Sequence, residues 1–107
     1  MADYIQVTTV TSSQKEAENI AQELLKTRLA ACIQISGPVS STYWWQNTIE
    51  SAQEWVCQIK TSRSLYPRVE ATIRRLHSYQ VPEILALSVL DGNQDYLKWL
   101  EGELTKV

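Results

Sequence analysis

The sequence predicts an α+β fold of ferredoxin-like type, in which elements in the order βαββαβ form an antiparallel sheet with both helices on one face, followed by a C-terminal helix. Three observations support this prediction. Two strand-like segments in the middle of the chain form one long hairpin. One stretch with apolar residues at helical spacing precedes the hairpin in the sequence, and another follows it. After these come a short apolar run and a third stretch with helical spacing. A length of 107 residues with 44% hydrophobic content fits one domain over residues 1–107.

The first strand and the first helix follow from β-branched residues and a capping pattern. Residues 4–10 are mostly β-branched and partly alternating, which predicts a strand. Ser13 and Glu16 have the spacing of a capping box, in which the hydroxyl accepts from a helical N–H and the carboxylate reaches back to the cap. The stripe of the helix then consists of Ala17, Ile20, Ala21, Leu24, Leu25 and Leu29.

Two strand-like segments in the middle of the chain predict the hairpin. Residues 32–45 form a bent strand that Ser36-Gly37-Pro38 interrupts, and residues 54–61 form its partner. The turn is expected at Gln46-Asn47, although it could fall anywhere between Asn47 and Ala52.

The second half of the chain predicts a helix, a strand and a last helix. Ser64 is the expected N-cap of the second helix, Pro67 lies in its first turn, and His77 falls at its end. Residues 84–90 are almost continuously apolar, which favours a central strand, and Asn93 can cap the last helix. The two helical stripes are Val69, Ile73 and Leu76, and then Tyr96, Leu97, Leu100 and Leu104.

The hairpin carries more aromatic surface than one layer of helices can cover. Side chains alternate along a strand, so Trp44 must face away from Tyr43 and Trp45. Each buried ring removes about 150–250 Å² from water, which approaches the size of the largest apolar patch on a soluble monomer. A symmetric oligomer would cover the open face. The alternatives are a hairpin that folds back over its own sheet and a small-molecule stacking site.

Composition and charge exclude several classes of function. The chain has 10 basic and 12 acidic residues, so it lacks the basic excess of a nucleic-acid-binding protein. The first residues have no basic region of a signal peptide, and no run of about eighteen apolar residues predicts a membrane span. Cys32 and Cys57 form no CxxC pair, so free thiols and a cytoplasmic location are expected.

A few side chains are candidates for chemistry. His77 is the only histidine, and it can either cap the end of its helix as a histidinium or, when neutral, ligate a divalent metal with Cys32 or Glu83. Packing is the alternative for Cys32 and, more strongly, for Cys57. Glu54 and Lys60 share a strand face, where they could line a cleft or form a structural ion pair.

Catalysis has little support in the sequence. No serine has a histidine or a nucleophile-elbow context, and three glycines supply no phosphate-binding loop. Glu50, near the tip of the hairpin, is expected to be solvated. The sequence therefore predicts a protein that is not an enzyme.

The ordered motifs of the chain resemble the CutA divalent-cation tolerance family. They are Leu29-Ala30-Ala31-Cys32-Ile33, Tyr43-Trp44-Trp45, Glu54, Ile59-Lys60-Thr61, His77-Ser78-Tyr79-Gln80-Val81-Pro82-Glu83-Ile84 and Tyr96-Leu97-Lys98-Trp99-Leu100. The resemblance implies a ferredoxin-like protomer, an interlocked homotrimer similar to PII signalling proteins, and a cytoplasmic role in tolerance of copper and other divalent metals. It implies no reaction.

The resemblance also implies a set of site residues at the subunit boundary. The ligand-binding cleft would consist of Tyr43, Trp45, Glu54, Lys60, Tyr79, Glu83 and Trp99, and the metal candidates are His77 and Cys32. The chain departs from the family pattern at Asn47, where glycine is usual, at Ser78, where proline commonly follows the histidine, and at Leu76, where some members have a second histidine. Without that second imidazole, a tight copper site would need Cys32 or another subunit.

The leading hypothesis is a non-enzymatic homotrimer that binds copper, another divalent metal or a small regulatory ligand in clefts between subunits. The first alternative is a trimeric scaffold that docks an unknown protein partner without metal. The second alternative is an enzyme that depends on Lys60 or Glu54.

Overall fold

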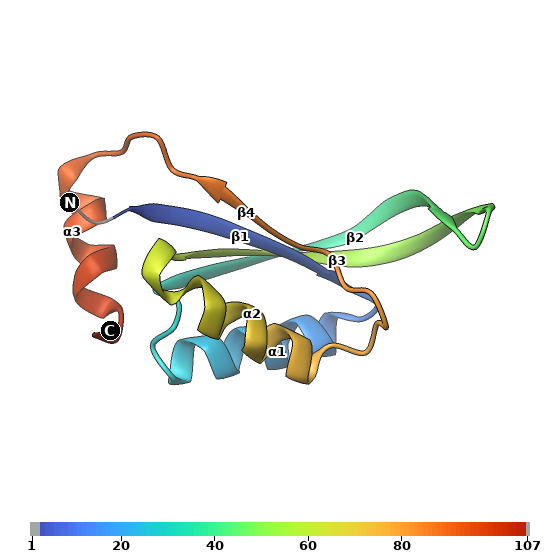
Figure 1. Cartoon of the computed structure of the whole chain (residues 1–107), viewed down its shortest axis with the longest axis horizontal. Coiled ribbons are helices and arrows are strands. Elements are labelled where there is room, and N and C mark those ends of the chain that lie inside the picture. The colour runs from blue at the N-terminus through green and yellow to red at the C-terminus, as the bar shows by residue number, and fades with distance from the viewer. Residues whose placement is uncertain (1–2, 107) are drawn as a thin grey trace.

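The computed structural model describes residues 3–106, which form one four-stranded antiparallel sheet covered by helices on one face (Figure 1). The strands are β1 (Tyr4–Thr11), β2 (Cys32–Trp45), β3 (Thr48–Ser62) and β4 (Ile84–Ser88), in the order β2-β3-β1-β4. The helices are α1 (Gln14–Lys26), α2 (Tyr66–Leu76) and α3 (Gln94–Glu103), and a short 3₁₀ turn, η1 (Arg63–Leu65), precedes α2. The predicted ferredoxin-like βαββαβ fold with a C-terminal helix is confirmed.

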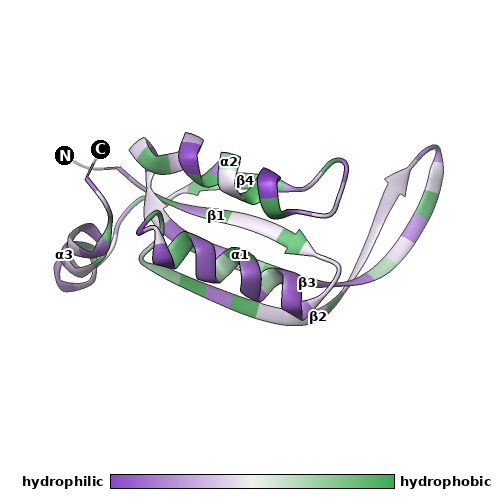
Figure 2. Ribbon diagram, turned by 90° about the horizontal axis from the view of Figure 1, so that it is seen from below, coloured by the Kyte–Doolittle hydropathy of each residue, from purple (hydrophilic) through white to green (hydrophobic). Residues whose placement is uncertain are grey.

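The core lies between the sheet and the two helices α1 and α2, which run side by side under the sheet (Figure 2). Burial alternates along β1, where Ile5 and Val7 face the helices and pair with Thr61 and Ile59 of β3. Each fully buried aliphatic side chain of this layer stabilises the fold by about 1.5–3 kcal/mol. The layer is completed by Ala17, Ile20, Leu24, Cys57, Leu65, Val69 and Ile73.

The first helix confirms half of the predicted capping box. The Ser13 hydroxyl accepts from the backbone N–H of Glu16 at 3.1 Å. The Glu16 carboxylate instead accepts from the backbone N–H of Ser78 at 3.3 Å, so it ties the helix start to the segment after α2. The stripe is buried except at Leu25, which is 38% exposed, and Leu29 lies beyond the helix end, where Arg28 has positive φ.

Two predictions about the second half were wrong. Ser64 does not cap α2, because the 3₁₀ turn places Leu65 at the N-cap and the Ser64 hydroxyl contacts that of Ser62 at 3.1 Å. The strand after Pro82 is not central, because β4 pairs with β1 alone and forms an edge of the sheet. Its side chains Leu85 and Leu87 are 58% and 63% exposed on the face opposite the helices.

The hairpin of β2 and β3 is longer than predicted and projects beyond both helices (Figures 1 and 2). Its turn is the two-residue loop Gln46–Asn47, where both residues have positive φ as a type I′ turn requires. Asn tolerates this conformation well, whereas Gln adopts it less readily. Among residues 3–106, no helix is long and apolar enough to cross a membrane.

Candidate functional site

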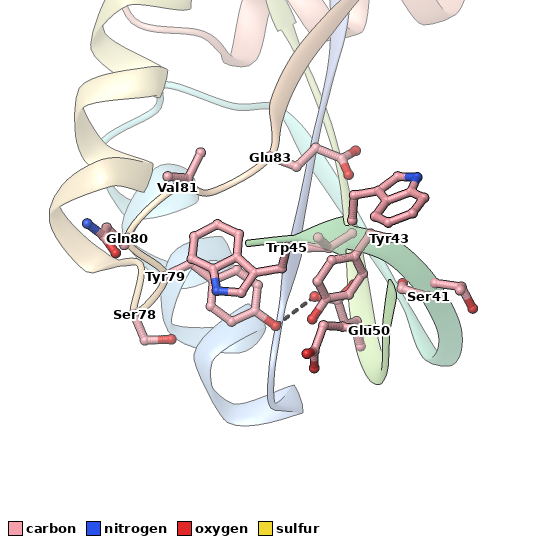
Figure 3. A pocket seen from close by; sticks show the side chains of 13 residues that line it. Ser41, Tyr43, Trp45, Glu50, Ser78, Tyr79, Gln80, Val81 and Glu83 are labelled. Carbon is pink, nitrogen blue, oxygen red and sulfur yellow. Dashed lines mark hydrogen bonds between the residues drawn. The ribbon is translucent and has the colours of Figure 1, made fainter. Parts of the chain in front are cut away.

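A pocket of about 800 Å³ opens between the projecting hairpin and the segment that joins α2 to β4 (Figure 3). The hairpin supplies one wall and residues 78–83 supply the other. The hairpin residues are Ser41, Thr42, Tyr43, Trp44, Trp45, Glu50 and Glu54, and the remaining ones are Val10, Ser78, Tyr79, Gln80, Val81 and Glu83.

A β-bulge determines which hairpin side chains face the pocket. The register of β2 against β3 shifts between Ser36 and Val39, and after this shift Tyr43 pairs with Glu50. Directly opposed residues of an antiparallel pair share a face, and side chains alternate along each strand. Tyr43 and Trp45 therefore lie on the same face as Glu50 and Glu54, as the alternation in the sequence predicts for the two aromatic residues.

Glycine is required at the bulge because another aromatic ring lies against it. A Cβ at Gly37 would come within 2.5 Å of Cδ1 of Trp55. Such a contact is far shorter than side chains allow, so Gly37 lets the Trp55 ring pack directly on the bent backbone of β2.

A hydrogen bond joins the two walls of the pocket. The hydroxyl of Tyr79 donates to Oε2 of Glu54 at 2.6 Å, and only 4% of Glu54 is exposed (Figure 3). Burial raises the pKa of Tyr79 well above its usual value, and the hydrogen bond to Glu54 raises it further. The phenol therefore remains protonated and donates. In the part of the chain that the structure describes, no basic side chain forms an ion pair with Glu54.

His77 fixes the second wall against the rest of the fold. The Tyr79 N–H donates to Nδ1 of His77 at 3.1 Å, and Nε2 lies 2.7 Å from the carbonyl oxygen of Val10. Because Nδ1 accepts, the proton is on Nε2, which donates to Val10. The side chain is fully buried, Oε2 of Glu16 lies 3.4 Å from Nδ1, and the ring lies 4.9 Å from that of Tyr79. Within one chain, both ring nitrogens already have partners.

The remaining predicted cleft residues lie near the other end of the sheet. Nζ of Lys60 donates to Gln34 at 3.1 Å and lies 5.7 Å from the ring centre of Tyr96 in α3, which itself stacks near Trp99. Lys60 and Glu54 share a face of β3, but six residues of strand put them about 20 Å apart. The structure therefore brings Tyr43, Trp45, Glu54, Tyr79 and Glu83 together, and it places Lys60 and Trp99 elsewhere.

The two metal candidates do not meet within one chain. Cys32 lies beside Lys60 of β3, and Lys60 lies beside Gln6 of β1. His77 instead contacts Val10, which is four residues further along β1 than Gln6. This corresponds to about 13 Å along the sheet. Over residues 3–106, no three His, Cys, Asp or Glu side chains gather in a way that could hold a metal ion.

The second cysteine is a packing residue, as predicted. Cys57 is fully buried under α1, with Sγ 3.9 Å from the carbonyl oxygen of Ala17. Burial, with a smaller effect of the Glu16 charge, raises the pKa of the Cys57 thiol to about 11. The thiol therefore has almost no thiolate form at neutral pH and little reactivity.

Sequence reasoning missed Glu50 as a pocket residue. The expectation that it is solvated was correct, because Glu50 is exposed, but it also lines the pocket opposite Tyr43. The signal that could have found it is the turn position. With the loop at Gln46–Asn47, strand pairing puts Glu50 directly across from Tyr43.

The geometry defines the class of protein: a small ferredoxin-like α+β protein with an open sheet face and a pocket beneath a projecting hairpin. Comparison with known proteins agrees, since residues 5–103 match the family model described as CutA1 divalent ion tolerance protein. The chain therefore belongs to the CutA1 divalent ion tolerance protein family. That description names tolerance of divalent ions and no reaction.

Individual relatives are similar over most of this chain. The divalent-cation tolerance protein CutA of Thermus thermophilus is 40% identical over 82% of this chain and 85% of its own length. Protein CutA of Mus musculus is 39% identical over 82% of this chain, which spans about half (50%) of the mouse protein. The crystal structure of CutA1 from Oryza sativa superimposes with a TM-score of 0.95 at 30% identity, covering 98% of this chain and 96% of that one.

Proposed function

We propose that this protein acts in the cytoplasm as a non-enzymatic homotrimer that binds copper, another divalent metal or a small ligand in clefts between its subunits. One observation supports this proposal above all: the sheet face opposite the helices carries exposed leucines, Leu85 and Leu87, beside an unpaired strand edge. Exposed apolar groups next to free backbone donors and acceptors favour association with another copy.

The sheet order leaves two edges through which copies could associate as a ring. Within one chain β2 and β4 are the two edges of the sheet, so each has one side without a strand partner. If the β2 edge of one copy meets the β4 edge of the next, the contact is head-to-tail, and such contacts generate a closed ring when the rotation between copies closes and an open filament when it does not. A three-membered ring would also place the projecting hairpin of each subunit against a neighbour, which makes the pocket an intersubunit cleft.

Metal binding is proposed between subunits, because His77 and Cys32 lie apart in one chain. A Cys32 thiolate or a carboxylate such as Glu83 could meet ligands from a neighbouring copy. A histidine ligand would have to give up one hydrogen bond, to Val10 or to Tyr79.

Calorimetric titration with copper and zinc tests this proposal. The assembled wild type is expected to bind the metal saturably. The affinity should fall about tenfold or more in Cys32→Ser and in His77→Ala, because each variant removes a proposed ligand. Cys57→Ser is the matched control, since its thiol is buried away from the open face and should not contribute. Weak, unsaturable heats that are identical in wild type and variants would contradict metal binding.

The scaffold alternative has one supporting observation. Trp44 and Ile49 pair on the hairpin face that turns away from Tyr43, and they are 71% and 60% exposed. Two large apolar side chains side by side are typical of a protein contact. A partner that wild type retains after complete metal removal, and that Trp44→Ser releases, would favour this alternative.

A further inference from the structure

The pocket under the hairpin is negatively charged and contains no compensating base. Three glutamates line it, Glu50 and Glu54 from β3 and Glu83 from the opposite wall, whereas no described lining residue is Lys, Arg or His. Glu54 is the most informative of them, because it is only 4% exposed and its partner is the neutral hydroxyl of Tyr79. A buried carboxylate normally has a cationic partner, since removing its charge from water is costly.

Aromatic faces surround these carboxylates. Tyr43, Trp45 and Tyr79 line the same pocket (Figure 3). The apolar residues Val10 and Val81 line it as well. Aromatic rings attract cations through the negative potential of their faces, and the attraction is larger where water is partly excluded. The combination of rings and carboxylates thus favours a ligand that carries both a positive charge and apolar carbon.

A bare metal ion fits this pocket less well. The three glutamates do not converge as a metal-ligating group among the described residues, and one oxygen of Glu54 is already occupied by Tyr79. Divalent metals need several donors at short, fixed distances. A volume of about 800 Å³ is instead typical of sites for small organic molecules.

We infer that this pocket binds a small organic ammonium cation, with its charged nitrogen beside Glu54 and its carbon skeleton against Tyr43 and Trp45. This inference names the ligand class for the proposed ligand-binding function and rests on that function. It requires that the pocket remains open as a cleft in the assembled protein.

Titration of the assembled wild type with benzylammonium chloride tests the inference. Benzyl alcohol is the neutral counterpart, because it has the same ring without the charge. We expect benzylammonium to bind saturably, to quench the tryptophan fluorescence, and to bind at least tenfold more tightly than benzyl alcohol. Equal binding of the two probes, or no binding of either, would overturn the inference.

The Glu54→Gln variant identifies the charge responsible. Its amide oxygen can still accept from Tyr79, so the loss of charge is isolated, and benzylammonium affinity should fall about ten- to a hundredfold. Glu101→Gln is a matched control, because Glu101 also accepts from a tyrosine hydroxyl, that of Tyr4 at 3.0 Å, but lies outside the pocket. Unchanged affinity in Glu54→Gln, or an equal loss in Glu101→Gln, would contradict the assignment.

The two proposals can fail separately. Sedimentation of the same samples reports the assembly. If the trimer is intact but benzylammonium does not bind, the ligand class is wrong while the proposed assembly stands. If benzylammonium binds saturably to a protein that sediments as a monomer, the homotrimer is wrong and the cation pocket stands.

Discussion

Replacing Leu85 and Leu87 together by glutamate is expected to convert the proposed homotrimer into monomers. Both side chains lie on the open face of the edge strand β4 and are more than half exposed in one chain, at 58% and 63%. Burying each leucine in a subunit contact contributes about 1.5–3 kcal/mol, and burying a carboxylate there instead costs several kcal/mol more. Sedimentation velocity of the double variant at micromolar concentration is the measurement.

The control for this variant is Leu25→Glu. Leu25 is also a partly exposed leucine, but it lies on α1, in the helix layer on the opposite side of the sheet. Its substitution should leave the assembly unchanged. Circular dichroism should show that both proteins keep their fold. A double variant on β4 that sediments as wild type would rule out the open face as the subunit contact.

The second large effect is expected for His77→Ala, which should lower the free energy of unfolding by about 2–4 kcal/mol. The imidazole is fully buried, and its loss leaves the Val10 carbonyl and the Tyr79 N–H without their partners. Because these bonds hold residues 78–83 against β1, the wall of the pocket should loosen as well. Urea denaturation monitored by tryptophan fluorescence measures the change.

Ser78→Ala serves as the neighbouring control. Ser78 is exposed, and its contact with Glu16 uses the backbone N–H, which the substitution keeps. Its stability should stay within about 0.5 kcal/mol of wild type. A histidine variant as stable as Ser78→Ala would show that the buried imidazole does not anchor this wall.

The fold was largely predictable because its signals are local. Alternation along β1, the Ser13 cap and the apolar stripes of α1 and α2 each depend on neighbouring residues, and all are observed. The position of β4 was not predictable in the same way. An apolar run indicates that a strand is covered, but it cannot distinguish cover by the same chain from cover by another copy. Leu85 and Leu87 are apolar and yet exposed within one chain, on an edge strand.

The sequence predicted which strand face each site residue lies on, but not how far along the strand it lies. Strand parity correctly separated Trp44 from Tyr43 and Trp45, and it correctly put Glu54 and Lys60 on one face. The alternation of side chains gives no distance along a strand. It therefore could not show that Lys60 lies outside the pocket. The contact of His77 with Val10 was also out of reach, because it joins residues 67 positions apart in the chain.

The proposed homotrimer is tested most directly by the mass of the wild-type protein, measured by sedimentation equilibrium at low micromolar concentration without added metal. If the open sheet face and the projecting hairpin are subunit contacts, the protein will sediment as one species with the mass of a trimer. A single species with the mass of one chain, 12.2 kDa, would contradict the homotrimer.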